Sequence, residues 1–141
     1  MRKDIPLMIV LGLLAAPRAV LHDLGLIHER TGVNALLVFV PLLIWVLVAV
    51  TRSPNPIRLL LGAGVVYGIS LAVIHNALWN GESTVAEPLA RVAMTLSSLV
   101  TGAAVGAICG GIAWLITRRR SARAEPRGTG GSRHDGGPAA S

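Results

Sequence analysis

Four long apolar stretches separated by short polar segments dominate the chain. They cover residues 5–24, 33–50, 59–79 and 92–116, and few charged residues fall inside them. About 20 helical residues cross the roughly 30 Å hydrocarbon core of a bilayer, and a helix satisfies its backbone polar groups internally. The pattern therefore predicts an all-α, polytopic membrane protein with four transmembrane helices in an antiparallel bundle, near residues 5–24, 33–50, 59–79 and 90–116.

The residues after the last stretch predict a tail rather than a second domain. Residues 117–141 are rich in Gly, Arg, Pro and Ser and show no apolar periodicity, which is typical of disorder. The chain is 52% hydrophobic and 14% charged, and its loops are too short to hold a soluble domain. We expect a transmembrane domain over residues 1–116 and a disordered basic cytoplasmic tail over residues 117–141.

Basic residues predict the orientation of the helices. Six of the twelve arginines lie between Arg118 and Arg133, and the others include Arg52 and Arg58 between the second and third stretches. Such clusters mark the cytoplasmic side and attract anionic lipid headgroups. Both termini are therefore expected in the cytoplasm, and headgroup contacts are expected at Arg118, Arg119, Arg120 and Arg123.

The net charge of +6 does not predict nucleic-acid binding, because the tail has no aromatic side chain to stack on a base. Twelve arginines stand against one lysine, and Ala, Gly and Val are abundant. This composition is typical of GC-rich bacterial genomes. It favours a multi-pass protein of a bacterial inner or plasma membrane.

The first stretch resembles a signal peptide, since Arg2 and Lys3 precede an apolar run. Pro17 follows Ala15 and Ala16 directly, which disfavours cleavage after these small residues. We expect an uncleaved helix bent at the proline.

Small residues recur at every fourth position in the last two helices. In lipid, such rows let two backbones approach closely enough for van der Waals packing to hold them together. Two interpretations stay open: the rows pack on each other within one chain, or the row in the last helix builds a homo-oligomer. The rows are Gly64, Gly68 and Ala72 in the third helix, and Ser98, Gly102, Gly106 and Gly110 in the fourth.

Histidines gather on the predicted external side and suggest a ligand or metal site. Imidazole nitrogens and carboxylate oxygens are the ligands that zinc prefers, although their spacing here matches no recognised metal motif. The competing interpretation is that these side chains sit at headgroup level, and no metal, haem or other cofactor is expected. The candidate ligand residues are His22, His28, Glu29, His75 and Asn76.

Hydroxyl side chains in the external half of the last helix allow two interpretations. They either line a shallow polar cavity with His75 and Asn76, or they bond to their own helix carbonyls one turn back. Arg91 at the start of this helix is interpreted as a charge on the rim. The hydroxyls belong to Thr95, Ser97, Ser98 and Thr101.

No arrangement of nucleophile, base or paired carboxylates is recognisable, so we do not expect an enzyme. The first hypothesis for function is an assembly or accessory subunit packed through its glycine-rich helices, with lipid and a second copy or another membrane protein as partners. The alternative is a small transporter, channel or metal-handling protein whose polar, histidine-containing site lies in the external half.

Overall fold

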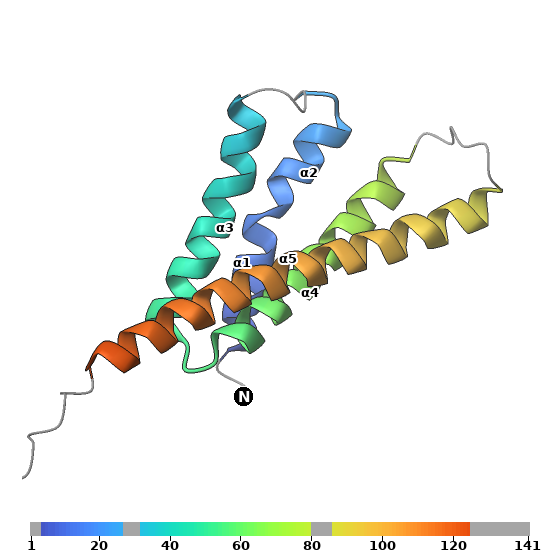
Figure 1. Cartoon of the computed structure of the whole chain (residues 1–141). Coiled ribbons are helices and arrows are strands. Elements are labelled where there is room, and N and C mark those ends of the chain that lie inside the picture. Colours follow the sequence, from blue (N-terminus) through green and yellow to red (C-terminus); the bar gives the residue numbers. More distant parts are fainter. Residues whose placement is uncertain (1–3, 27–31, 80–85, 125–141) are drawn as a thin grey trace, which may run out of the picture.

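The computed structural model describes residues 4–26, 32–79 and 86–124, and the regular structure in these ranges is helical. The elements are α1 (Ile5–Leu14), α2 (Ala16–Asp23), α3 (Gly32–Arg52), α4 (Pro56–Ala77) and α5 (Glu87–Ala124) (Figure 1). Four spans are long and apolar enough to cross a membrane: α1 with α2, then α3, α4 and α5. The prediction of an all-helical chain with four such segments is confirmed.

The first span is interrupted at Ala15, two residues before the proline at which we predicted the bend. Pro17 has no N–H to donate to the Leu13 carbonyl four residues back. The Ala15 N–H bonds to that carbonyl instead. The Leu11 carbonyl, one turn before Ala15, accepts the Trp45 indole N–H at 2.7 Å. Because the Ala15 N–H bonds to Leu13, it does not bond to the Leu11 carbonyl, and this carbonyl accepts from Trp45 of α3 instead.

α4 and α5 begin earlier than predicted because proline is favoured in the first turn of a helix. α4 begins at Pro56, behind an Asn55 side chain that accepts the Arg58 N–H at 3.2 Å. α5 begins at Glu87, with Pro88 in its first turn. Proline is favoured there because the first N–H groups of a helix have no partner inside it.

The predicted boundary between the last helix and the tail is wrong. α5 continues to Ala124, eight residues beyond the predicted end, so residues 117–124 are helical. Arginine and alanine, which fill most of this segment, favour the helix, and the next proline is Pro126. The fall in hydropathy after residue 116 marks where an apolar surface ends and not where the helix ends. Residues 125–141 lie outside the described part of the chain.

α4 and α5 run in opposite directions along each other, and their backbones meet at glycines. A Cβ atom added to Gly102 would lie 2.6 Å from the Gly68 Cα, and one added to Gly64 would lie 2.8 Å from the Gly106 Cα. Further along the same contact, a Cβ at Gly110 would lie 2.9 Å from the Ile57 Cα. Real Cβ atoms do not approach backbone so closely, so no larger residue fits this register.

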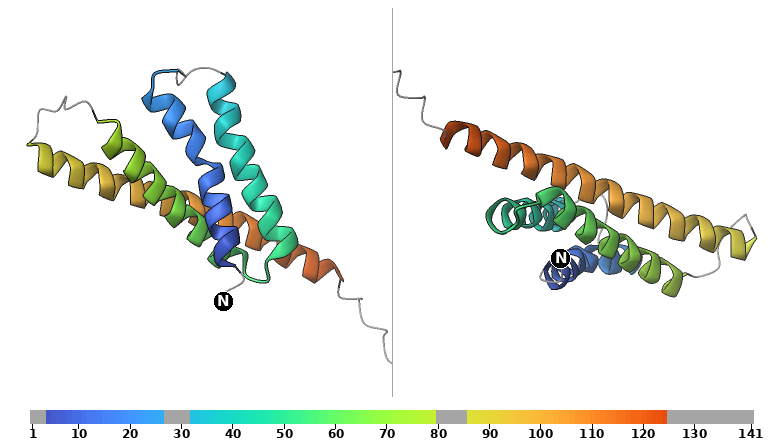
Figure 2. Two further views of the ribbon diagram at one scale, coloured as in Figure 1. Left: turned by 180° about the vertical axis from the view of Figure 1, so that it is seen from behind. Right: turned by 90° about the horizontal axis from the view of Figure 1, so that it is seen from below.

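The helices form two hairpins that converge at one end and diverge at the other (Figures 1 and 2). The axes of α4 and α5 are inclined to those of α2 and α3, so the four spans do not share one direction. The buried core lies at the convergent end, beside the α3–α4 turn. Its fully buried members are Trp45, Ala49, Leu59, Leu60, Ala63 and Ala113.

Outside this core, large apolar side chains face outwards, as in a protein surrounded by lipid. On α3, Leu36, Phe39 and Leu43 are each more than 60% exposed. α4 is the most enclosed span, with 44% of its apolar window buried against 22% for α3. α4 therefore holds the two hairpins together, and the space where they diverge lies beside its C-terminal half.

Candidate functional site

A cavity of about 690 Å³ lies where the hairpins diverge, between α2, α4 and α5. This volume is in the range of small-molecule sites, roughly 300–1,000 Å³. Much of its lining is polar, although the surrounding helices are apolar on their outer faces. The lining residues come from α2 (Arg18, Ala19, His22, Asp23), α4 (Tyr67, Leu71, His75) and α5 (Ala93, Met94, Ser97, Ser98, Thr101).

An aspartate and a histidine from different hairpins meet at the wall of this cavity. The Asp23 Oδ2 lies 2.6 Å from the His75 Nδ1, and the Oδ1 lies 3.5 Å from the His22 Nδ1. The Asp23 side chain is only 15% exposed, against 34% for His75. An imidazole N–H directed at the carboxylate compensates the charge that Asp23 brings into this half-buried place. The contact links the last turn of α2 to the last turn of α4.

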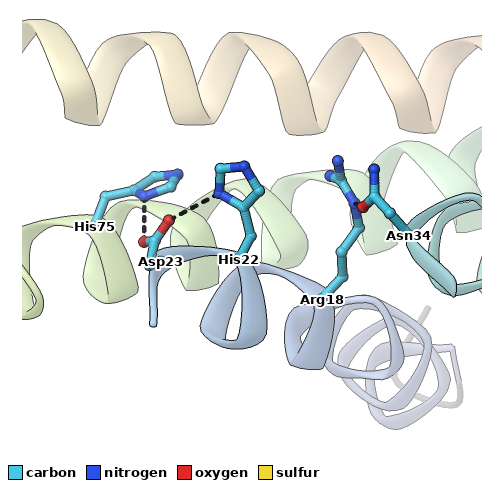
Figure 3. A network of polar contacts seen from close by, with 5 residues as sticks. All are labelled: Arg18, His22, Asp23, Asn34 and His75. Carbon is cyan, nitrogen blue, oxygen red and sulfur yellow. Dashed lines mark hydrogen bonds and ion pairs between the residues drawn. The ribbon is translucent and has the colours of Figure 1, made fainter. Parts of the chain in front are cut away.

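Arg18 lies about one helical turn deeper on α2. Its Nε donates to the Asn34 Oδ1 at 2.9 Å, and Asn34 itself is buried on α3. Figure 3 shows that Arg18, His22 and Asp23 all extend from α2 to the same side, toward α5, while His75 approaches from α4. These polar side chains are therefore gathered on one side of α2 at the cavity.

Hydroxyl groups on α5 face the cavity without internal partners. Within the described ranges, six of the nine Ser and Thr side chains make a hydrogen bond, and most of these donate to a carbonyl one turn back. The other three are Ser97, Ser98 and Thr101, and all of them line the cavity. Ser98 is only 6% exposed. Ser97 and Thr101 are exposed, and no buried side-chain oxygen of the described residues lacks a hydrogen-bond partner, so the three hydroxyls are accessible from the cavity to a bound molecule or to water.

The residues predicted for a ligand site have different surroundings. His22 and His75 line the cavity. Asn76 does not: its Nδ2 donates to the Ala72 carbonyl at 2.8 Å and to the Thr95 Oγ1 at 3.2 Å. Thr95 in turn donates to a carbonyl of its own helix. His28 and Glu29 lie outside the described residues.

A metal site is not assembled by the described residues. No three of the described His, Cys, Asp and Glu side chains are placed to hold a metal ion. Asp23 lies between two imidazoles that face it, so the three groups are directed at each other and not at a common centre.

Arg91 lies at the start of α5 and caps the C-terminal end of α4. It contacts the Glu87 carboxylate at 2.9 Å and donates from Nη1 to the Asn76 carbonyl at 3.1 Å. Its guanidinium also lies 5.0 Å from the centre of the Trp79 ring. Arg91 thus satisfies a carbonyl in the last turn of α4, which gives it a structural role at the rim.

Three residues of the cavity were not among the candidate site residues named from the sequence: Arg18, Asp23 and Tyr67. Arg18 follows an apolar run, which is typical of a long side chain that reaches the membrane surface. The sequence did contain an indication: Arg18 and His22 are four residues apart, so they lie on one side of an otherwise apolar helical segment. Charged residues that share a side of a span usually face a protein interior.

A double-mutant cycle on Asp23→Asn and His75→Ala should measure a coupling energy of about 1 kcal/mol. Hydrogen bonds to charged groups contribute about 1.5–3 kcal/mol, and partial exposure of His75 reduces this value. The measurement is the free energy of unfolding in mixed micelles. The exposed Glu87–Arg91 pair is the control, because exposed pairs one turn apart contribute about 0.3–0.5 kcal/mol. Equal coupling in both pairs would contradict the prediction.

The fold is compatible with a small multi-pass membrane protein, since four of its helical spans are long and apolar enough to cross a membrane, and the cavity gives it a polar site between helices. The chain matches no protein-family model, and no curated protein or solved structure is significantly similar to it.

Proposed function

We propose that this protein binds a small polar molecule in the cavity between α2, α4 and α5, and that it acts as a transporter or a related ligand-handling protein of the membrane. The observation that carries this proposal is the group of three hydroxyls on α5 that face the cavity without a partner. The Asp23–His75 pair lies at the wall of the same cavity. Polar groups placed inside a span are costly and usually serve a ligand or ion path.

The contacts of the glycine rows argue against an assembly role for these rows. Gly102 and Gly106 lie against Gly64 and Leu60 of the same chain. A second copy that used this face of α5 would first have to displace α4. The remaining apolar surface is of the kind that lipid covers, so we favour the ligand-binding role.

We propose that the cavity opens toward the external side. Figure 1 shows the start of α1, the α3–α4 turn and the C-terminal end of α5 at the end opposite to the diverging hairpins. This end carries Arg52, Arg58 and the arginines in the last two turns of α5, namely Arg118, Arg119, Arg120 and Arg123, which the positive-inside rule assigns to the cytoplasm. Arg118 also lies 5.2 Å from the centre of the Trp114 ring, an arrangement suited to the headgroup level of a bacterial cell membrane.

Cysteine labelling in the membrane tests whether the cavity holds water. Cys109 is the only cysteine of the chain, so a Cys109→Ala background allows single cysteines to be placed. Thr101 lines the cavity, whereas its neighbour Val100 is 68% exposed on the apolar surface. We expect a small ionised thiol reagent to label Thr101→Cys at least about tenfold faster than Val100→Cys, because a charge enters hydrocarbon only at a cost of several kcal/mol.

Equal and slow labelling at positions 100 and 101 would contradict the proposal, since the cavity would then be dry or filled by lipid. Labelling both variants after solubilisation in dodecyl maltoside and denaturation confirms that each thiol is present and reactive. Ser121→Cys, at the exposed end of α5, gives the rate expected in open water.

A further inference from the structure

We infer that the ligand is an anion whose carboxylate or phosphate group binds to Arg18. This inference rests on the proposed function and names the chemical class of its ligand. The acid group would lie between the Arg18 guanidinium on α2 and the hydroxyls of Ser98 and Thr101 on α5. All three of these residues line the cavity.

Arg18 has donors left over for a ligand. A guanidinium has five N–H groups in a planar fork, and the recorded hydrogen bond of Arg18 uses only the Nε, which donates to Asn34. The ion pairs formed in residues 4–26, 32–79 and 86–124 involve other cations, so no described carboxylate neutralises Arg18. The bond to Asn34 fixes the orientation of the fork, and the terminal amino groups suit two-point binding of an acid group.

The acidic residue of the cavity does not compete for this role. Asp23 is held by His75 at 2.6 Å and faces His22 at 3.5 Å, so imidazole groups occupy both carboxylate oxygens. The terminal N–H groups of Arg18 donate to no described group, whereas both Asp23 carboxylate oxygens already face imidazole nitrogens. An anion can therefore use the remaining donors of Arg18, whereas a cation would have to compete with the imidazoles for the Asp23 carboxylate.

The opposite wall supplies matching hydrogen bonds. Hydroxyl groups donate as well as accept, and those of Ser97, Ser98 and Thr101 have no recorded partner in the described part of the chain. Tyr67, which is only 8% exposed, also lines the cavity and is a fourth residue that carries a hydroxyl group. Donors on two facing helices can surround an acid group, as a guanidinium alone cannot.

The acid group has two sources with the same chemistry: a free metabolite-sized anion or the phosphate of a lipid headgroup. The cavity is partly open and lies within membrane-spanning helices, so both can reach Arg18. The experiment distinguishes them by adding the anions separately from the phospholipid.

Protection from labelling tests the inference with known probes. Ala93 lines the cavity but has no polar group to contribute, so Ala93→Cys in the Cys109→Ala background serves as the reporter. In dodecyl maltoside, we expect phosphate or succinate to slow the labelling of Ala93→Cys, compared with chloride at equal ionic strength. Choline, added as its chloride salt, should give no protection.

Arg18→Gln should raise the phosphate concentration that gives half-protection about tenfold or more, because it removes the charge and the paired donors. Arg91→Gln is the matched control and should keep the protection of the unmodified chain, since Arg91 pairs with Glu87 outside the cavity. If Arg18→Gln fails to fold, Arg18→Lys replaces it. We expect this variant to need several-fold more phosphate, because an ammonium lacks the planar fork, and an unchanged value would contradict the inference.

Different results would overturn the anion inference and the proposed function. Labelling of Ala93→Cys and Thr101→Cys without protection by any anion would overturn the anion inference and leave the water-filled cavity in place. Absence of labelling in the folded protein would overturn the proposed function itself. Protection that is present in phosphatidylglycerol vesicles without added anion, and lost in dodecyl maltoside, would identify the lipid headgroup as the source of the acid group.

Discussion

Gly102→Leu should prevent α4 and α5 from packing and should cost at least about 4 kcal/mol of stability, the range of the most damaging single substitutions. A Cβ at this position would lie 2.5 Å from the Gly68 nitrogen and 2.6 Å from its Cα. Both atoms belong to the backbone, which cannot move aside as a flexible side chain can. The loss of folded protein in an SDS titration of mixed micelles is the measurement.

Two alanine substitutions on the same helix provide the control. Gly102→Ala adds one methyl group and should still cost about 1–3 kcal/mol through overpacking. At Gly111, by contrast, an added Cβ meets no atom within 4 Å, so Gly111→Ala should leave stability unchanged or raise it by up to about 1 kcal/mol. Equal effects at positions 102 and 111 would show that helix propensity, and not the approach of α4, decides the cost.

The same comparison bears on oligomerisation. If Gly102 served only a contact between two copies, its replacement by leucine would yield a folded monomer. Because the glycine contacts lie within one chain, we expect unfolding or aggregation of the monomer instead. The size of the folded species, measured by light scattering, separates the two outcomes.

Most of the helical architecture could be predicted from the sequence because lipid leaves few choices to the backbone. Long apolar runs such as residues 33–50 specify a helix wherever a bilayer surrounds them. The ends were harder to predict, since hydropathy falls at the membrane surface while the helix continues for as long as local propensity permits. The arginines after Ile116 extend α5 for this reason.

The site could be predicted only in part because it depends on the orientation of the two hairpins relative to each other. His75 was recognised as an unusual polar residue, but its partner Asp23 is 52 positions away in the sequence. The hydroxyls of α5 allowed two interpretations, and each interpretation holds for some of these residues. Thr95 bonds back to its own helix, whereas Ser98 faces the cavity. Periodicity places both on a helix but cannot say what lies opposite.

The position of α2, and with it the position of the site, depends on Trp45, which lies outside the cavity lining but contacts it through Tyr67. Trp45 is fully buried, and its indole N–H donates to the Leu11 carbonyl at 2.7 Å. Trp45 also packs edge-on against Tyr67, with 6.2 Å between the ring centres. It therefore joins the interrupted first span to α3 and α4, just before Ala15. The direction of α2 beyond this break decides where Arg18 and Asp23 lie.

Trp45→Ala should cost about 3 kcal/mol of stability, near the lower limit for removing a large aromatic side chain from a core. The lower limit applies because helices surrounded by lipid gain little from hiding apolar surface from water, so that lost packing and the lost hydrogen bond account for most of the effect. Trp45→Phe separates the effect of the lost hydrogen bond from that of the lost packing. It keeps most of the ring but leaves the Leu11 carbonyl without its indole donor, which should cost about 1–3 kcal/mol.

The Trp45 variants should also alter the cavity, because a freed α2 no longer holds Asp23 beside His75. We expect the coupling energy between Asp23 and His75 to decrease in the Trp45→Phe background. Trp114→Phe is the control: this indole is 39% exposed on the outer surface of α5, and its replacement should change neither stability in the core nor the coupling. If Trp45→Phe lowered stability and left the coupling intact, α2 would be positioned by its own contacts with α4. The break at Ala15 would then be a local feature of the first span.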